Sequence, residues 1–129
     1  MGSNLRPLVI LCIDDQTSLL SARTLVLQNE GYSVLAASSA AEGLRKFREM
    51  QVDLVISDHL LGGTTGAEIA AQMKREKPEI PIILISGVSE IPEGAQHVDL
   101  FLSKLEGPVV MLQEISKLLS RGNATAAGK

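Results

Sequence analysis

The chain has very few aromatic residues, a single cysteine and no excess of positive charge. Tyr32, Phe47 and Phe101 are its only aromatic residues, too few for the stacking platforms on which proteins bind single-stranded nucleic acids. The 12 Lys and Arg residues are outnumbered by 15 Asp and Glu residues, so little positive charge is left over to neutralise a row of phosphates. We therefore expect no nucleic acid among the ligands.

A lone cysteine, Cys12, excludes a disulfide within the chain and a cysteine-based zinc site. Because Cys12 lies in an apolar run, we expect it to be a small buried hydrophobe. No apolar stretch approaches the ~20 residues of a membrane span, and the first residues lack the pattern of a signal peptide. These absences favour a cytoplasmic protein that does not bind membranes.

What the chain does have is the composition of one globular domain. Its 129 residues are 45% hydrophobic and 21% charged, which is ordinary for a single folded unit. We predict an N-terminal extension over 1–7, the folded domain over 8–120 and a disordered tail over 121–129. No output domain follows residue 120, which favours a stand-alone regulator, although the chain could also be a fragment of a longer protein.

Strand and helix patterns alternate along the chain. Apolar runs rich in β-branched residues predict strands with both faces buried at 8–13, 33–37, 53–57, 81–86 and 99–103. Apolar residues at helical spacing predict helices over 17–29, 41–50, 67–76 and 109–119. Between 87 and 98 the chain holds Pro92 and Gly94 and has room for at most one or two helical turns. Such alternation predicts an α/β fold with a parallel sheet covered on both faces.

Polar side chains follow four of the predicted strands. Asp14 and Asp15 follow the first, Asp58 the third, and Lys104 the fifth, while Ser86 ends the fourth. Ligands of such folds bind beyond the carboxyl ends of the strands. Crowded carboxylates require a cation, and Mg²⁺ with its preference for oxygen ligands is suitable. A phosphoryl group is the natural partner of that ion, so Asp58 is either a further metal ligand or a nucleophile.

These residues together resemble the receiver domain of two-component response regulators. The resemblance is carried by Asp14-Asp15, Asp58, Gly66, Ser86-Gly87 and Phe101-Leu102-Ser103-Lys104, and it covers about residues 7–120. It implies a doubly wound, flavodoxin-like fold with a five-stranded parallel sheet in the order 2-1-3-4-5. The span from Ser86 to Lys104 is shorter than usual by about one turn of ~3.6 residues, which implies a shortened fourth helix.

The resemblance also implies a reaction. A sensor histidine kinase or a phosphotransfer protein would donate a phosphoryl group to Asp58, and the domain would catalyse this transfer to itself. Mg²⁺ would be held by Asp15, Asp58 and the backbone carbonyl of Leu60, with Asp14 reaching the ion through water. Lys104 would neutralise charge in the transition state. The domain would thus catalyse its own phosphorylation and dephosphorylation without being a classical turnover enzyme.

A switch follows the transfer in this family. Backbone N–H groups of His59 and Gly87 would bind the phosphoryl oxygens, Ser86 would move towards them, and Phe101 would swing inward. The surface of the fourth helix, fifth strand and fifth helix would then bind a downstream protein, with the domain a monomer or a phosphorylation-dependent dimer.

The sequence departs from the family's pattern at several positions. Leu105 follows Lys104 where the family usually has proline, and Gly62 stands where proline is common. The two positions that tune the phosphoryl lifetime hold Leu60 and Val88, which are both apolar and cannot orient an attacking water. We therefore expect slow self-dephosphorylation.

Other interpretations remain open from the sequence. Asp14-Asp15 could cap the first helix, and His59 could ligate a metal, although three carboxylates and one His do not make a zinc site. The whole domain could be a pseudo-receiver, a docking module that is never phosphorylated. A phosphatase of the haloacid-dehalogenase kind would need acids two residues apart after the first strand, and a flavin-binding protein would need hydroxyls and aromatic residues that are absent here.

Overall fold

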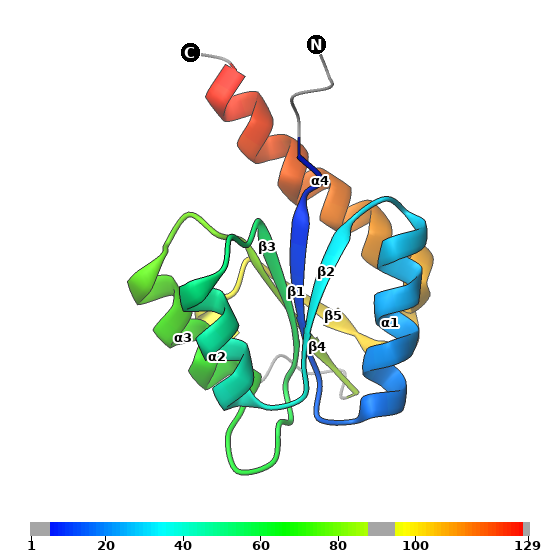
Figure 1. Cartoon of the computed structure of the whole chain (residues 1–129), viewed down its shortest axis with the longest axis vertical. Coiled ribbons are helices and arrows are strands. Elements are labelled where there is room, and N and C mark those ends of the chain that lie inside the picture. Colours follow the sequence, from blue (N-terminus) through cyan, green and yellow to red (C-terminus); the bar gives the residue numbers. More distant parts are fainter. Residues whose placement is uncertain (1–5, 88–94, 128–129) are drawn as a thin grey trace.

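The computed structural model describes residues 6–87 and 95–127, in which five strands alternate with helices (Figure 1). The strands are β1 (Val9–Ile13), β2 (Ser33–Ala37), β3 (Leu54–Asp58), β4 (Ile82–Ser86) and β5 (Leu100–Ser103). The α-helices are α1 (Thr17–Asn29), α2 (Ala40–Glu49), α3 (Gly66–Glu76) and α4 (Gly107–Ala127). Two 3₁₀ turns, at Ala95–His97 and Lys104–Glu106, flank β5.

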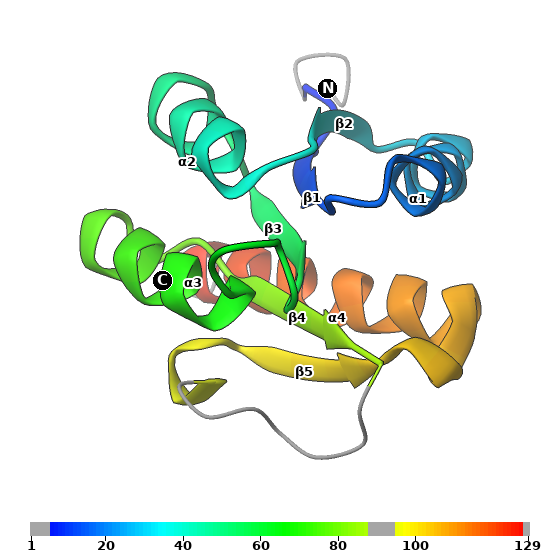
Figure 2. The ribbon, with the colours of Figure 1, turned by 90° about the horizontal axis from the view of Figure 1, so that it is seen from below.

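The strands form one parallel sheet in the order β2-β1-β3-β4-β5, as predicted. Helices α1 and α4 cover one face, and α2 and α3 cover the other (Figure 2). Because side chains alternate along a strand, β1 contributes to both cores. Ile10 and Cys12 pack towards α1 and α4, whereas Leu11 and Ile13 pack towards α2 and α3. This two-sided burial explains why the strands are continuously apolar.

The strand register gathers the polar strand ends at one edge of the sheet. Asp58 pairs with Ile85 across β3 and β4, and Ser86 pairs with Ser103 across β4 and β5. Lys104 directly follows Ser103 and so lies near Ser86 at the end of β4. Asp14 directly follows the neighbouring strand β1. The fold places the predicted site residues together through backbone pairing alone.

The crossover between β4 and β5 contains little helix in its described part. One 3₁₀ turn, Ala95–His97, precedes β5, and residues 88–94 lie outside the described residues. Helix α4 is consequently the counterpart of the family's fifth helix. The predicted shortened fourth helix falls largely on residues 88–94, outside the described residues, so it stays a prediction.

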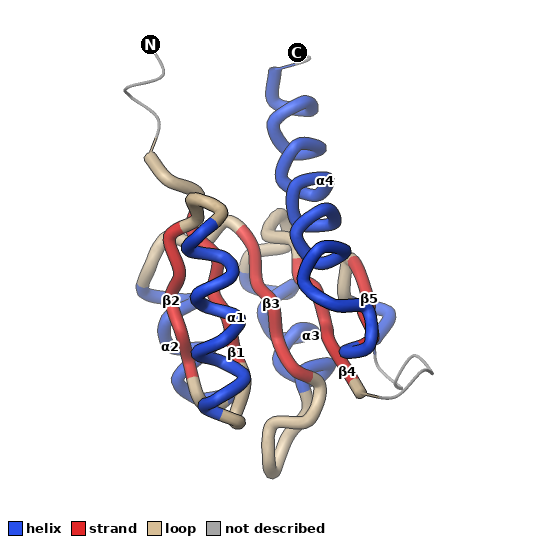
Figure 3. The backbone as a smooth tube through the Cα atoms, turned by 90° about the vertical axis from the view of Figure 1, so that its right-hand side faces the viewer, coloured by secondary structure: helices blue, strands red, loops and turns tan. Residues whose placement is uncertain are grey.

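Helix α4 is longer than the sequence suggested. It continues to Ala127 instead of ending at Leu119, so 121–127 are helical where a disordered tail was expected. Three of the last four residues of α4 are alanine, the best helix former, which offsets the cost of Gly122. The end of α4 projects past the sheet (Figure 3). Of the helices that the structure describes, none has the length and apolar character to span a membrane.

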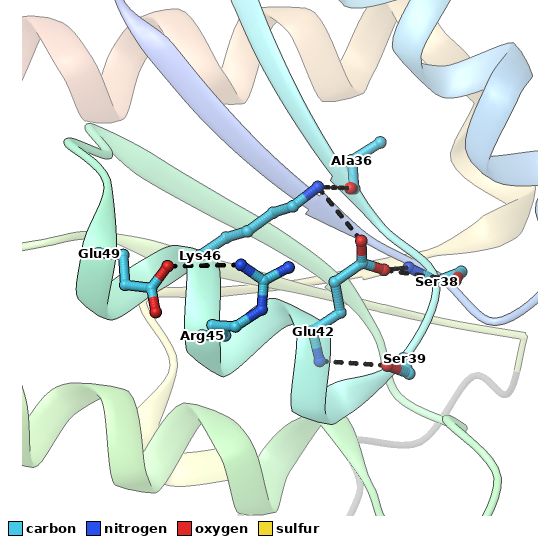
Figure 4. Close-up of polar contacts among 7 residues, drawn as sticks. All are labelled: Ala36, Ser38, Ser39, Glu42, Arg45, Lys46 and Glu49. Carbon is cyan, nitrogen blue, oxygen red and sulfur yellow. Dashed lines mark hydrogen bonds and ion pairs between the residues drawn. The ribbon is translucent and has the colours of Figure 1, made fainter.

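The start of helix α2 is fastened to β2 by a polar network (Figure 4). Ser39 Oγ accepts a hydrogen bond from Glu42 N at 3.1 Å, and Glu42 Oε1 accepts one from Ser38 N at 2.8 Å. Lys46 Nζ lies 2.6 Å from the backbone oxygen of Ala36 and 3.3 Å from Glu42 Oε2. The network satisfies backbone groups at the helix terminus and on the strand.

Replacing Lys46 with methionine should lower the free energy of unfolding by about 1 kcal/mol, because a charge-assisted hydrogen bond to the backbone is lost. Urea denaturation measures this difference. Arg45→Met in the same helix is the matched control, because among the described residues Arg45 makes only an exposed ion pair with Glu49 at 3.4 Å and should contribute little. Equal effects of the two substitutions would contradict the assignment.

Candidate functional site

Three carboxylates gather at the carboxyl-terminal edge of the sheet. Asp14, Asp15 and Asp58 each offer an oxygen, and these oxygens all lie within 4.8 Å of one another. Asp14 and Asp58 are buried, while Asp15 is exposed. Asp58 is the last residue of β3, and the aspartate pair directly follows β1. The cluster predicted from the strand ends is therefore present.

Asp58 has two different neighbours for its two oxygens. Its Oδ2 accepts a hydrogen bond from the backbone N–H of Leu60 at 3.1 Å. Its Oδ1 lies 2.8 Å from Lys104 Nζ, an ion pair without the alignment of a hydrogen bond. The carboxylate is only 6% exposed, so the lysine neutralises it where water is largely excluded. Lys104 thus contacts Asp58, the residue beside which the sequence analysis expected it to act.

Leu105, which replaces the usual proline, has a local structural explanation. Lys104 opens a 3₁₀ turn, and Ser103 Oγ accepts a hydrogen bond from Leu105 N at 3.1 Å. Proline has no N–H to donate, so this turn requires another residue at 105. With leucine at 105, Lys104 still forms the ion pair with Asp58.

The alternative in which the aspartate pair caps α1 is not what the structure shows. The N-cap is Gln16, whose side chain makes no capping hydrogen bond. Asp14 Oδ1 instead accepts a hydrogen bond from the backbone N–H of Gln16 at 2.9 Å, a local turn typical of aspartate. Asp14 and Asp15 therefore lie before the helix and remain part of the acidic cluster.

Arg23 is a site residue that the sequence analysis missed. Its Nη1 lies 3.2 Å from Asp14 Oδ2. The residue follows the buried Leu20 by three positions and precedes the buried Leu27 by four, so all three share one helix face. That spacing was the available signal, because it places a charged residue on the inward face of α1.

Cys12 lies beneath this ion pair and is fully buried. Burial raises the pKa of the Cys12 thiol to about 11, and Arg23 opposes this rise only in part. The Cys12 thiol therefore stays protonated near neutral pH. Because thiols react only as thiolates, Cys12 is unreactive there. This agrees with the prediction of a small buried hydrophobe.

The loop between β3 and α3 is closed by specific contacts. Thr65 and Glu68 form a capping box at the start of α3, for which the sequence carries the usual signature. The backbone N–H of Gly66 donates to the oxygen of His59 at 2.6 Å. Gly62 has a φ of 59°, which glycine adopts readily and proline cannot. The glycine at 62 is thus required by the turn.

The remaining predicted residues lie around this edge. Ser86 is buried at the end of β4, and the half-buried Phe101 packs against Ala67 and Leu84. The side chain of Leu60 is 66% exposed. Val88 lies outside the described residues, so its proposed effect on phosphoryl lifetime stays a prediction.

One predicted oxygen-binding group is not available. The backbone N–H of His59 donates to the oxygen of Ile85 at 2.8 Å, so the sequence-based assignment of this group to a phosphoryl oxygen is corrected. The side chain of His59 is not in the cluster of candidate metal ligands found among the described residues. The neighbouring Leu60 N–H, which faces Asp58, was the group to expect.

The donor set suits a hard divalent cation. All candidate side-chain ligands are carboxylates, and oxygen ligands with several waters are what Mg²⁺ prefers. Three negative charges face the two cations Arg23 and Lys104, so negative charge is left over at the site. The residues present therefore fit Mg²⁺.

The chain is similar in sequence to named regulatory proteins of bacteria. The chain is 35% identical over 120 residues to the transcriptional regulatory protein GlrR of Escherichia coli, covering 90% of this chain and 27% of GlrR. It is 30% identical over 116 residues to the regulatory protein VanR of Enterococcus faecium, covering 87% of this chain and 50% of VanR. The chain thus spans half or less of the length of these relatives.

Solved structures agree over nearly their whole length. A CheY-like response regulator receiver domain protein from Methanospirillum hungatei has a TM-score of 0.87 at 26% identity, covering 93% of this chain and 99% of that protein. TrrA from Thermotoga maritima, solved in complex with Mg²⁺-BeF, has a TM-score of 0.82 at 28% identity, covering 86% of this chain and 98% of TrrA.

The response regulator receiver domain family matches residues 10–116. With the acidic edge and its lysine in place on this sheet, the chain belongs to the receiver domains of two-component response regulators.

Proposed function

We propose that this receiver domain accepts a phosphoryl group on Asp58 from a histidine kinase or phosphotransfer protein, and that phosphorylation changes its binding to a downstream protein. One observation carries the proposal. The buried carboxylate of Asp58 lies 2.8 Å from Lys104 Nζ and within 4.8 Å of the carboxylates of Asp14 and Asp15. A nucleophile beside both a cation and a metal site is the arrangement that phosphoryl transfer needs.

Mg²⁺ is the cofactor of this proposal. Asp15, Asp58 and the backbone carbonyl of Leu60 would hold it, with Asp14 acting through water. When bound, the ion neutralises charge on the phosphoryl oxygens and on the crowded carboxylates. The Mg²⁺ in the solved complex of TrrA and the match between the acidic cluster and oxygen-ligand chemistry support this assignment.

The chain's own residues act on the phosphoryl group directly. A carboxylate oxygen of Asp58 attacks phosphorus as the P–N bond of the donor's phosphohistidine breaks, and the imidazole leaves with the electron pair. Lys104 exchanges its contact with Asp58 for the transferred oxygens, which carry the developing charge. The N–H groups of Leu60 and Gly87 donate to the same oxygens. The burial of Asp58 excludes most of the water that would compete for these contacts.

The phosphoryl group would then be sensed by Ser86, at the end of β4, and by Phe101, in the strand β5 that leads to α4. This region presents two exposed apolar side chains, Leu105 at 89% and Val109 at 65% exposure, which suit a protein partner. We assign the downstream partner to the surface of the β4–β5 crossover, β5 and α4, with the domain a monomer or a phosphorylation-dependent dimer. The receiver itself would work in the cytoplasm without binding nucleic acid, in accordance with its charge balance.

The experiment is intact mass spectrometry after incubation with acetyl phosphate, with and without Mg²⁺. We expect one phosphoryl adduct that requires Mg²⁺ and is absent in Asp58→Asn. Asp53→Asn is the matched control, because Asp53 lies just before the opposite end of β3 and pairs with Arg6 at 2.8 Å. That variant should still form the adduct.

The absence of an adduct with acetyl phosphate and with phosphoramidate would overturn the proposal and favour the pseudo-receiver. An adduct that persists in Asp58→Asn would overturn the assignment of the acceptor residue.

A further inference from the structure

Arg23 is a largely buried cation that the proposed transfer does not use. Its side chain is only 11% exposed, and its Nη1 lies 3.2 Å from Asp14 Oδ2, which belongs to a carboxylate with no exposure. A buried arginine is tolerated only when it is paired. The two side chains therefore stabilise each other in the absence of any metal.

Both oxygens of Asp14 already have partners in the protein, although Asp14 lies within the acidic cluster. Oδ1 of Asp14 accepts the N–H of Gln16 and Oδ2 faces Arg23, so protein groups contact both oxygens. Asp58 is matched by Lys104. Two of the three carboxylates thus already have a resident cation, and a divalent ion entering the cluster meets the positive charge of both.

Only one of these two cations has a place in phosphoryl transfer. Lys104 faces the acceptor Asp58, whereas Arg23 approaches from α1 on the side of Asp14. An apolar cavity of about 270 Å³ lies beside both, lined by Leu19, Val26 and Met111 together with the two cations. Arg23 therefore borders free space that its guanidinium could enter on leaving Asp14.

From this geometry we infer that Arg23 is a resident counter-ion that competes with Mg²⁺ for Asp14. It stabilises the metal-free site and lowers the affinity for the ion, and Mg²⁺ binding turns it towards the cavity. The inference rests on the proposed function, because it concerns the same metal site. Arg23 is thus a positioning residue that sets the Mg²⁺ concentration at which the domain becomes competent for phosphorylation.

The test is a Mg²⁺ titration followed by backbone amide chemical shifts, which measures affinity without phosphorylation. Arg23→Met should lower the Mg²⁺ dissociation constant about tenfold or more, because a neighbouring charge changes the affinity of a carboxylate for a cation by that order. The melting temperature of the metal-free variant should fall, and Mg²⁺ should restore more of it than in the wild type. Arg45→Met, which removes an exposed arginine paired with Glu49, should change neither quantity.

Arg23→Gln is the second variant, because its amide can still donate to Asp14 while the charge is gone. It should also bind Mg²⁺ more tightly, and it serves if the methionine variant does not fold. Unchanged or weaker Mg²⁺ binding in the folded variants would overturn the counter-ion role and leave the proposed function standing. A wild-type domain whose amide shifts do not respond to Mg²⁺ would overturn both.

Discussion

Replacing Gly66 with alanine is expected to lower the free energy of unfolding by about 3 kcal/mol, the upper range for forcing a methyl group into packed structure. A β-carbon at this position would lie 2.5 Å from Leu84 Cδ1 and closer still to the backbone oxygen of Asp58. That second neighbour is backbone and cannot rotate away. Helix α3 would have to move from the end of β3, and its N–H bond from Gly66 to His59 would be strained.

Urea denaturation of the metal-free domain measures this loss. Gly87→Ala is the matched control, since a β-carbon there meets nothing within 4 Å and should be neutral or slightly stabilising. Because the backbone of Asp58 is the contact, Gly66→Ala should also slow phosphoryl acceptance. A Gly66→Ala domain as stable as the control would show that α3 does not rest on the end of β3.

Replacing Lys104 with methionine should slow Mg²⁺-dependent phosphorylation by acetyl phosphate about a hundredfold or more, the usual cost of removing one charged group aimed at a developing charge. The lysine is the described cation nearest to Asp58, at 2.8 Å, and methionine keeps most of its apolar length. The rate is measured as the growth of the adduct by mass spectrometry.

Lys117→Met on α4 is the control for this substitution. Lys117 is 67% exposed and pairs with Glu114 at 3.4 Å, far along α4 from the acidic cluster in sequence, so its loss should leave the rate unchanged. A Lys104→Met domain that is phosphorylated at the wild-type rate would mean that the ion pair with Asp58 serves stability alone.

The ends of the strands could be predicted from the sequence because each apolar run and the charged residue that ends it are neighbours in the chain. A run such as Val9–Ile13 is buried on both faces, so the first charged residue after it marks the edge of the sheet. Asp14, Asp58 and Lys104 each follow or end such a run, and parallel pairing then brings them together. The α/β class and the acidic cluster followed from these local patterns, whereas the strand order was implied by the resemblance to receiver domains.

Other features depend on contacts that no local pattern encodes. The spacing of Arg23 places it on the inward face of α1, but its partner, the buried Asp14 nine residues earlier, is known only from the structure. The commitment of the His59 N–H to Ile85 depends on the register between β3 and β4. The length of α4 depends on weak helix propensities near a terminus, where alanine outweighs a single glycine.

The contact between Lys46 and Ala36 also covers a backbone hydrogen-bond acceptor at the edge of the sheet. The backbone oxygen of Ala37 accepts from Asp14 N at 3.1 Å and so points towards the side of β1. Carbonyls alternate in direction along a strand, so that of Ala36 points outward, away from the sheet. Strand β2 is the outermost strand on this side, and an open acceptor there would be a template for pairing with another chain. The ammonium of Lys46 occupies that acceptor at 2.6 Å, so the side chain that fastens α2 also removes one open acceptor from the edge of the sheet.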